Sequence, residues 1–139
     1  MEKENKCIFC KIVRGEIPSV KIYEDENLFA FMDIAPANPG HAMVIPKGHF
    51  ETLVDIPDDL ANDMTLLTKK IARAAMSALA AEGFNIAMNN KQVAGQVVPH
   101  AHIHIIPRFK GDGQHIHWKP NLKARKSVET SAEKIRSFL

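Results

Sequence analysis

The sequence predicts an α+β domain, in which an antiparallel β-sheet of about five strands is combined with one long helix and short helices near the chain ends. Three observations predict this class: several short apolar runs are bounded by turn residues, one long segment has helical spacing, and the two ends carry short helical patterns. A length of 139 residues, without internal repeats or a shift in composition, indicates a single domain over 1–139.

The N-terminal part contains one short helical segment and three strands. Residues 8–13 fit one or two helical turns, ended by Gly15 and Pro18. The apolar runs between turn residues predict strands at 21–24, 28–32 and 42–45.

A long helix is predicted from Pro57 to Glu82. Pro57 suits the first helical position, and Asp58 favours the positive end of the helix dipole. Gly83 is expected to end the helix. The apolar residues recur at steps of three and four, which predicts one buried face made of Leu60, Met64, Leu67, Ile71, Ala74, Ala75 and Ala78.

Two further strands, at 84–88 and 97–107, complete the sheet. Thr130 and Glu133 have the spacing of a capping box, which predicts that a short final helix opens there.

Composition excludes several classes of function. The chain is 45% hydrophobic and 24% charged, and its formal charge of +2 is too small to favour nucleic acid as the main partner. It has no apolar run long enough to cross a bilayer and no signal peptide at its start, so we expect a cytoplasmic protein without a membrane partner. In that compartment Cys7 and Cys10 are expected to be thiols or metal ligands rather than a disulfide.

The most informative feature is the row of His100, His102 and His104, followed by an apolar pair. In an extended strand these three side chains share one face, while Ala101 and Ile103 share the other. The row is compatible with a solvated strand face or a loose metal site. We favour a nucleophilic imidazole flanked by helpers, because each ring can act as base, acid or cation near pH 7.

The loop at 89–96 precedes this row and is rich in Asn and Gly. By itself it fits a hairpin loop as well as a turn whose N–H groups face an anion. A histidine that attacks phosphate needs its far nitrogen held by an acceptor and donors on the phosphoryl oxygens. The position of the loop beside the histidines therefore favours an anion site.

These residues resemble the histidine triad (HIT) family, whose signature is His-φ-His-φ-His-φ-φ with φ apolar. Within that family the chain is most similar to the bacterial-type branch, which is akin to the purine nucleoside phosphoramidases. The resemblance covers about 7–120 and leaves 121–139 as a C-terminal tail with a helix. Beyond the signature it rests on the segments 7–18, 31–34, 39–47, 95–96, 106–108 and 114–118.

The resemblance implies a hydrolase or transferase acting at the α-phosphate of purine nucleotide conjugates: phosphoramidates, aminoacyl-adenylates or dinucleoside polyphosphates. His102 would be the nucleophile, oriented by the carbonyl of His100, with His104 on the phosphate oxygens and His41 behind the row. The nucleotide would contact Asp33 through its ribose, and otherwise Ile8, Phe9, Ile12, Phe31, Ile34, Asn89, Gly95, Gln96 and Val97.

The resemblance also implies a homodimer and nominates zinc ligands. Two thiolates separated by two residues form half of a tetrahedral zinc site, although Cys7 and Cys10 also fit small apolar residues of a short helix. The resemblance nominates His49 and His100 as the other two ligands. Four protein ligands would leave no open position on the zinc, so it would be structural. His117 and Trp118 resemble a segment that reaches toward the partner's site.

One residue departs from the family pattern. Val97 stands where many members have Ser or Thr, whose hydroxyl is associated with the leaving group. An alternative function is therefore a nucleotide- or partner-binding module with little turnover. Zinc storage through the histidine row is a weaker alternative, because the chain has a single Cys pair.

Overall fold

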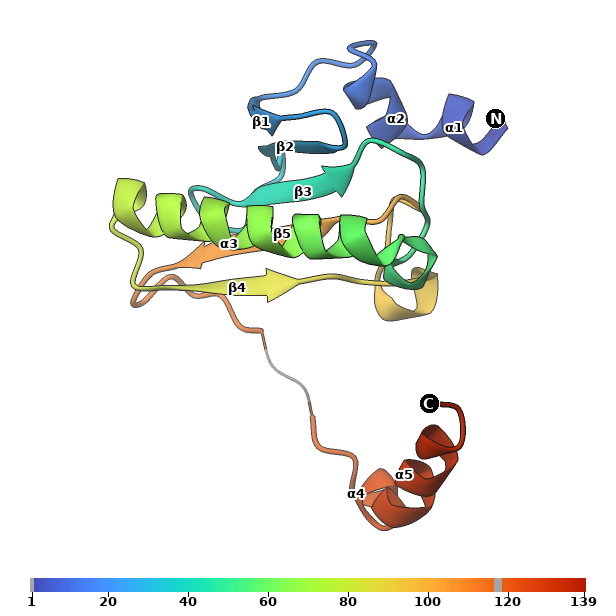
Figure 1. The fold of residues 1–139 in the computed structure, drawn as a ribbon. Helices are drawn as coiled ribbons and strands as arrows, with labels where there is room; N and C mark the ends of the chain where they lie inside the picture. The colour runs from blue at the N-terminus through green and yellow to red at the C-terminus, as the bar shows by residue number, and fades with distance from the viewer. Residues whose placement is uncertain (1, 117–118) are drawn as a thin grey trace.

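The computed structural model describes residues 2–116 and 119–139 and confirms the α+β class (Figure 1). The strands are β1 (Lys21–Glu24), β2 (Leu28–Met32), β3 (Ala42–Pro46), β4 (Gly83–Ala87) and β5 (Ile103–Arg108). The helices are α1 (Glu2–Lys6), α2 (Ile8–Val13), α3 (Asp58–Leu79), α4 (Leu122–Arg125) and α5 (Val128–Arg136), with 3-10 turns η1 (Leu53–Asp55) and η2 (Gln92–Ala94). Within the described residues, no helix is both long and apolar enough for a membrane span.

The sheet is antiparallel throughout, in the order β1-β2-β3-β5-β4. Strand β5 lies between β3 and β4, with His104 paired to Met43. The last histidine of the row is therefore fixed in the interior of the sheet.

Alternating side chains give the sheet two buried faces. On β2 and β3, Ala30 and Val44 belong to the cluster packed with α3, whereas Phe31 and Met43 belong to the cluster packed with α2. Figure 1 shows α3 crossing one face of the sheet, with α2 above β2 and β3 in the same view. The face packed with α2 is the one that carries His104, since His104 pairs with Met43.

The long helix is confirmed but ends earlier than predicted. It stops at Leu79, and Ala80 takes the left-handed conformation, with φ of 52°. Gly83 is therefore not the helix stop; it begins β4 and pairs with Arg108. The expected buried face is wrong at Ala74 and Ala78, which are exposed, while the buried residues of α3 are Met64, Leu67, Thr68, Ile71 and Ala72.

The strand predicted over 97–107 begins only at Ile103. Pro99 has no N–H to donate to a ladder, and the N–H of Ala101 donates to the carbonyl of Phe50 at 2.7 Å rather than to a neighbouring strand. His100 and His102 therefore lie in an irregular segment before the strand, and the premise of three histidines on one strand is wrong.

The C-terminal prediction is also corrected. Thr130 lies inside α5, which begins at Val128. The capping box is instead made by Thr52 and Asp55 at η1. Figure 1 shows α4 and α5 standing apart from the sheet, and neither helix contains a buried residue.

Candidate functional site

A cavity of about 470 Å³ lies between α2, β2 and the histidine segment. Ten of the twelve residues predicted to bind nucleotide line it: Ile8, Phe9, Ile12, Phe31, Asp33, Ile34, Gly95, Val97, His102 and His104. Asn89 and Gln96 are not among the lining residues. Other apolar residues that line the cavity were not predicted from the sequence, notably Ile17, Pro18, Met32, Met43 and Val98.

His102 is buried and held in one tautomer. Its Nδ1–H donates to the carbonyl of His100 at 2.7 Å, so the lone pair is on Nε2, the nitrogen left to face the cavity. Burial lowers the pKa of His102, which keeps the ring neutral at pH 7. The ring of Phe9 packs edge-on against it, with 5.1 Å between centroids. These contacts suit an imidazole nucleophile.

His104 and His41 form a relay that starts at a backbone amide. The N–H of Ala37 donates to Nδ1 of His41 at 2.9 Å, so the proton of this ring must be on Nε2. That Nε2–H donates to Nδ1 of His104 at 2.9 Å. His104 therefore has its proton on Nε2, where it can donate to a ligand in the cavity. Burial lowers the pKa of His41 and lowers that of His104 to about 4, so both rings are neutral.

Asp33 lies beside this relay. Its Oδ1 accepts the N–H of Ala35 at 2.8 Å, and its Oδ2 lies 3.5 Å from Nε2 of His41 and 3.9 Å from Nδ1 of His104. The three side chains are close enough to hold a metal ion, but the amide of Ala37 and the short contact between the rings explain their positions as a hydrogen-bonded relay. The carboxylate is thus held at the cavity wall as an acceptor.

The loop at 89–96 is held by hydrogen bonds between its own residues. The N–H groups of Gly95 and Gln96 donate to the carbonyls of Gln92 and Lys91, so these two groups are not free to face an anion, which corrects the anion site expected for this loop. The buried amide of Gln96 accepts from the N–H of Lys91 at 2.7 Å and donates to the carbonyl of Glu51 at 2.6 Å. The side chain of Gln96 therefore shapes the loop, while Gly95 and Val97 line the cavity.

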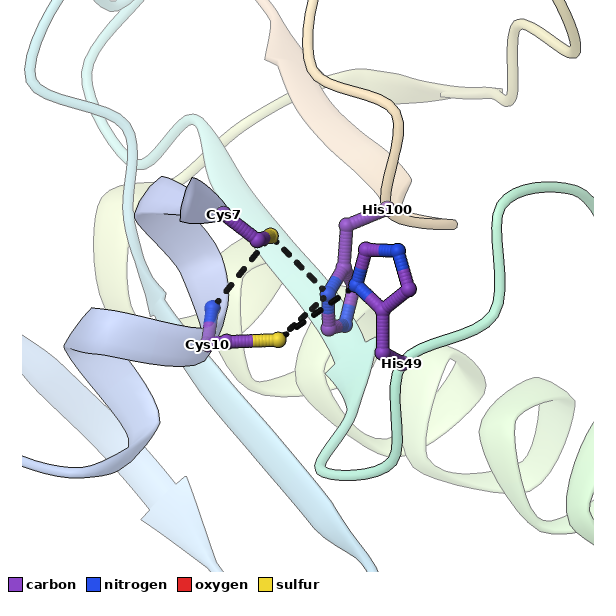
Figure 2. Close-up of side chains that lie close together, drawn as sticks. All are labelled: Cys7, Cys10, His49 and His100. Carbon is purple, nitrogen blue, oxygen red and sulfur yellow. Dashed lines mark hydrogen bonds between the residues drawn. The ribbon is translucent and has the colours of Figure 1, made fainter. Parts of the chain in front are cut away.

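A second cluster joins Cys7 and Cys10 to His49 and His100, as the sequence analysis expected (Figure 2). The Sγ of Cys7 lies 3.4 Å from Nδ1 of His100, and the Sγ of Cys10 lies 3.4 Å from Nδ1 of His49 and 3.5 Å from that of His100. Ordinary zinc bond lengths in a tetrahedron place sulfur and nitrogen ligands about 3.5 Å apart. The four side chains therefore fit a closed zinc site.

The protonation state of the cluster also suits a metal. The Nε2–H of His100 donates to the carbonyl of Pro46 at 2.9 Å, which leaves the lone pair of Nδ1 facing the sulfurs. Burial lowers the pKa of His100 to about 4. Burial and the neighbouring Cys7 raise the pKa of the Cys10 thiol to about 12, so a thiolate at Cys10 requires a cation beside it.

Comparison with known proteins identifies the class. The HIT domain model matches residues 14–111, and the chain belongs to the HIT family. An adenosine 5'-monophosphoramidase of Schizosaccharomyces pombe is 39% identical over 132 residues, which cover 94% of this chain and 96% of that protein.

Two solved structures resemble this fold closely. A HIT family member from Bacillus subtilis aligns with a TM-score of 0.87 and 42% identity, over 96% of this chain and 97% of that chain. A zinc-bound histidine triad family protein from Mycobacterium smegmatis aligns with a TM-score of 0.77 and 37% identity, over 98% of this chain and 99% of that chain.

Proposed function

We propose that this protein is a hydrolase or transferase that cleaves purine nucleotide conjugates at the α-phosphate through a nucleotidyl-histidine on His102. The observation that carries the proposal is the 2.7 Å hydrogen bond from Nδ1 of His102 to the carbonyl of His100, which leaves a basic Nε2 facing the cavity. The relative from Schizosaccharomyces pombe, named for an activity on adenosine 5'-monophosphoramidate, supports this chemistry.

The reaction has two displacement steps. Nε2 of His102 attacks the α-phosphorus; a phosphorus–nitrogen bond forms, and the leaving group departs with its electron pair and takes a proton from solvent. Water then attacks phosphorus, its proton goes to solvent, and the electron pair of the phosphorus–nitrogen bond returns to Nε2. In both steps the Nε2–H of His104 would donate to a phosphoryl oxygen, where negative charge redistributes.

The cavity divides into parts that suit a nucleotide. The rings and branched side chains of Phe9, Ile12 and Phe31 offer an apolar surface for a base. Asp33 offers an acceptor for the ribose hydroxyls. Val97, which is 90% exposed, lies at the cavity without a hydroxyl to protonate a leaving group.

We also propose structural zinc on Cys7, Cys10, His49 and His100. Four protein ligands would leave the metal no open position, so its chemical contribution is to hold the fold rather than to act on phosphate. The zinc-bound relative from Mycobacterium smegmatis supports this assignment.

We further propose a homodimer. Strand β4 is an edge strand, and a hollow of about 550 Å³ between α3 and β4 is lined in part by the exposed Phe84 and Ile86. Exposed apolar side chains on an unpaired edge strand are typical of a surface that is buried against another chain. The expected partner contact at His117 and Trp118 lies outside the described residues. Sedimentation of the wild type and of Phe84→Glu tests the dimer, because the charge should produce monomers.

The experiment that tests the activity combines turnover, binding and trapping. Steady-state hydrolysis of an adenosine phosphoramidate is measured beside titration with AMP, and mass spectrometry of protein quenched and kept at alkaline pH, where a phosphorus–nitrogen bond to imidazole survives, looks for an adenylyl group on His102. Turnover with the adduct supports the enzyme. Tight AMP binding without turnover or adduct would instead support the alternative, a nucleotide- or partner-binding module, which the lack of a hydroxyl at Val97 favours.

A further inference from the structure

The metal cluster and the nucleotide cavity share one short helix. Cys7 and Cys10 turn their sulfurs toward the two histidines, while Ile8 and Phe9, the residues between them, line the nucleotide cavity. The N–H of Cys10 also contacts the Sγ of Cys7 at 3.5 Å, which closes this turn. Any group that fixes the two sulfurs therefore fixes the wall of the cavity.

His100 connects the same two sites by a second route. Its Nδ1 faces both sulfurs, at 3.4 Å and 3.5 Å, while its carbonyl accepts the Nδ1–H of His102 at 2.7 Å. The ring of Phe9 packs edge-on against both histidines, with centroid distances of 5.8 Å to His100 and 5.1 Å to His102. The metal ligand, the cavity wall and the nucleophile are thus in direct contact.

We propose that zinc and nucleotide bind cooperatively, with Phe9 and His100 as the positioning residues that couple the two sites. This inference rests on the proposed zinc and nucleotide sites. Zinc on the sulfurs and on His100 would order the cavity wall and the nucleophile in advance, so a nucleotide would have less chain to order when it binds. Linkage then requires AMP to tighten zinc binding by the same factor.

The test measures both sides of this linkage. Calorimetry gives the AMP affinity of zinc-loaded and chelator-stripped protein, at a temperature where circular dichroism shows both folded. We expect zinc to tighten AMP about tenfold, equivalent to about 1.4 kcal/mol. Competition with a chromogenic chelator gives the zinc affinity with and without saturating AMP, and the same factor of about ten is expected.

Phe9→Leu is the informative variant, because it keeps all four metal ligands and removes the ring between the two histidines. Zinc should still bind stoichiometrically, while the coupling should fall to about threefold, the part carried by the contact between His100 and His102. Ile71→Val is the matched control: Ile71 lies in α3 on the other face of the sheet, so it should lower stability and leave the coupling at about tenfold.

If the stripped protein unfolds, the rate of zinc release to the chelator replaces the equilibrium measurement. AMP should slow release in the wild type and in Ile71→Val, and clearly less in Phe9→Leu at matched AMP saturation, because changes in affinity appear mainly in dissociation rates. An equal effect of AMP in Phe9→Leu would overturn the role of Phe9, since it would reflect general stabilisation.

Other outcomes separate this inference from the proposed function. Zinc and AMP that bind without affecting each other would overturn the coupling alone. A protein that binds AMP tightly but takes up no zinc would overturn the coupling together with the zinc site, and leave the nucleotide chemistry standing. A protein that binds zinc but no AMP would overturn the coupling together with the nucleotide site.

Discussion

The cysteine–histidine cluster and the cavity beside His102 each hold a histidine ring, and the two rings have opposite orientations. His100 donates from Nε2 to the carbonyl of Pro46 and turns the lone pair of Nδ1 to two sulfurs. His102 donates from Nδ1 to the carbonyl of His100 and leaves the lone pair of Nε2 to the cavity. In both, a backbone carbonyl selects the tautomer. A closed set of sulfur and nitrogen ligands then suits a metal, whereas an open cavity suits a substrate.

The largest expected effect is a loss of turnover, with nucleotide and metal binding retained. His102→Ala should lower kcat by at least about 10³-fold, because no other imidazole in the cavity has its lone pair held toward phosphorus. AMP affinity should stay within about threefold, since a nucleophile adds little to ground-state binding. Steady-state kinetics and calorimetry measure the two quantities. Turnover close to that of the wild type would refute the assignment of His102.

Removing the two sulfurs should affect metal binding and stability rather than turnover. Cys7→Ser combined with Cys10→Ser should abolish stoichiometric zinc and lower stability by about 3 kcal/mol, or roughly 10 °C in Tm. Metal analysis and calorimetric melting check this. The folded fraction should keep most of its kcat at saturating substrate, because no step of the chemistry runs through the metal. Activity that returns in proportion to added zinc, with no change in folding, would contradict this division.

Acid should destabilise the catalytic side through His104. Its pKa is lowered from about 6.5 to about 4 by burial and by the neighbouring His102 and His41, so protons bind the unfolded chain more tightly. The stability from the neutral ring is present above about pH 6.5 and is lost between about pH 6.5 and 4, amounting to about 3 kcal/mol. Urea unfolding across this range measures it, and His104→Asn should remove this share while leaving that of His100, whose pKa burial also lowers to about 4. An equally steep acid loss in the variant would assign it to other groups.

Asp33 lines the cavity and contacts none of the four proposed metal ligands, so replacing it tests the cavity alone. Asp33→Ala should weaken AMP by about one to two decades, the value of a hydrogen bond to a charged acceptor. Titration with 2′,3′-dideoxy-AMP is the control, since a ligand without ribose hydroxyls should bind wild type and variant alike. Wild-type protein that binds both nucleotides equally would remove Asp33 as the ribose acceptor.

The smallest effect concerns the relay behind the cavity. His41→Ala removes the donor to Nδ1 of His104 and frees that ring to change tautomer, so kcat should fall about tenfold with KM nearly constant. Nitrogen chemical shifts of His104 report its tautomer directly. If His41 had only a structural role, the tautomer would not change in the variant. His41→Gln offers an amide donor and should recover part of the loss. If the tautomer of His104 is unchanged in His41→Ala, His41 does not set it and the proposed relay is wrong.

Much of the fold was predictable because local patterns and tertiary packing agree. All five strands and the long helix occur close to their predicted positions, since turn residues and apolar spacing mark them. The predicted start of the last strand failed because the backbone there found a partner outside a strand ladder, and the predicted end of the long helix failed because a non-glycine residue took the left-handed conformation. Pro99 and the bond from Ala101 to Phe50 delay β5, and Ala80, rather than Gly83, ends the long helix.

By itself the sequence determined the residue types of the site: a histidine row, a pair of cysteines two residues apart and an acidic residue after an apolar strand. Only the tertiary structure decided which nitrogen of each histidine is free. That choice depends on the carbonyls of Pro46 and His100 and on the amide of Ala37, and backbone groups leave no signal in residue identity. It also decided that the cysteine turn forms the wall of the cavity, because contacts between residues some 90 positions apart are fixed by packing rather than by local pattern.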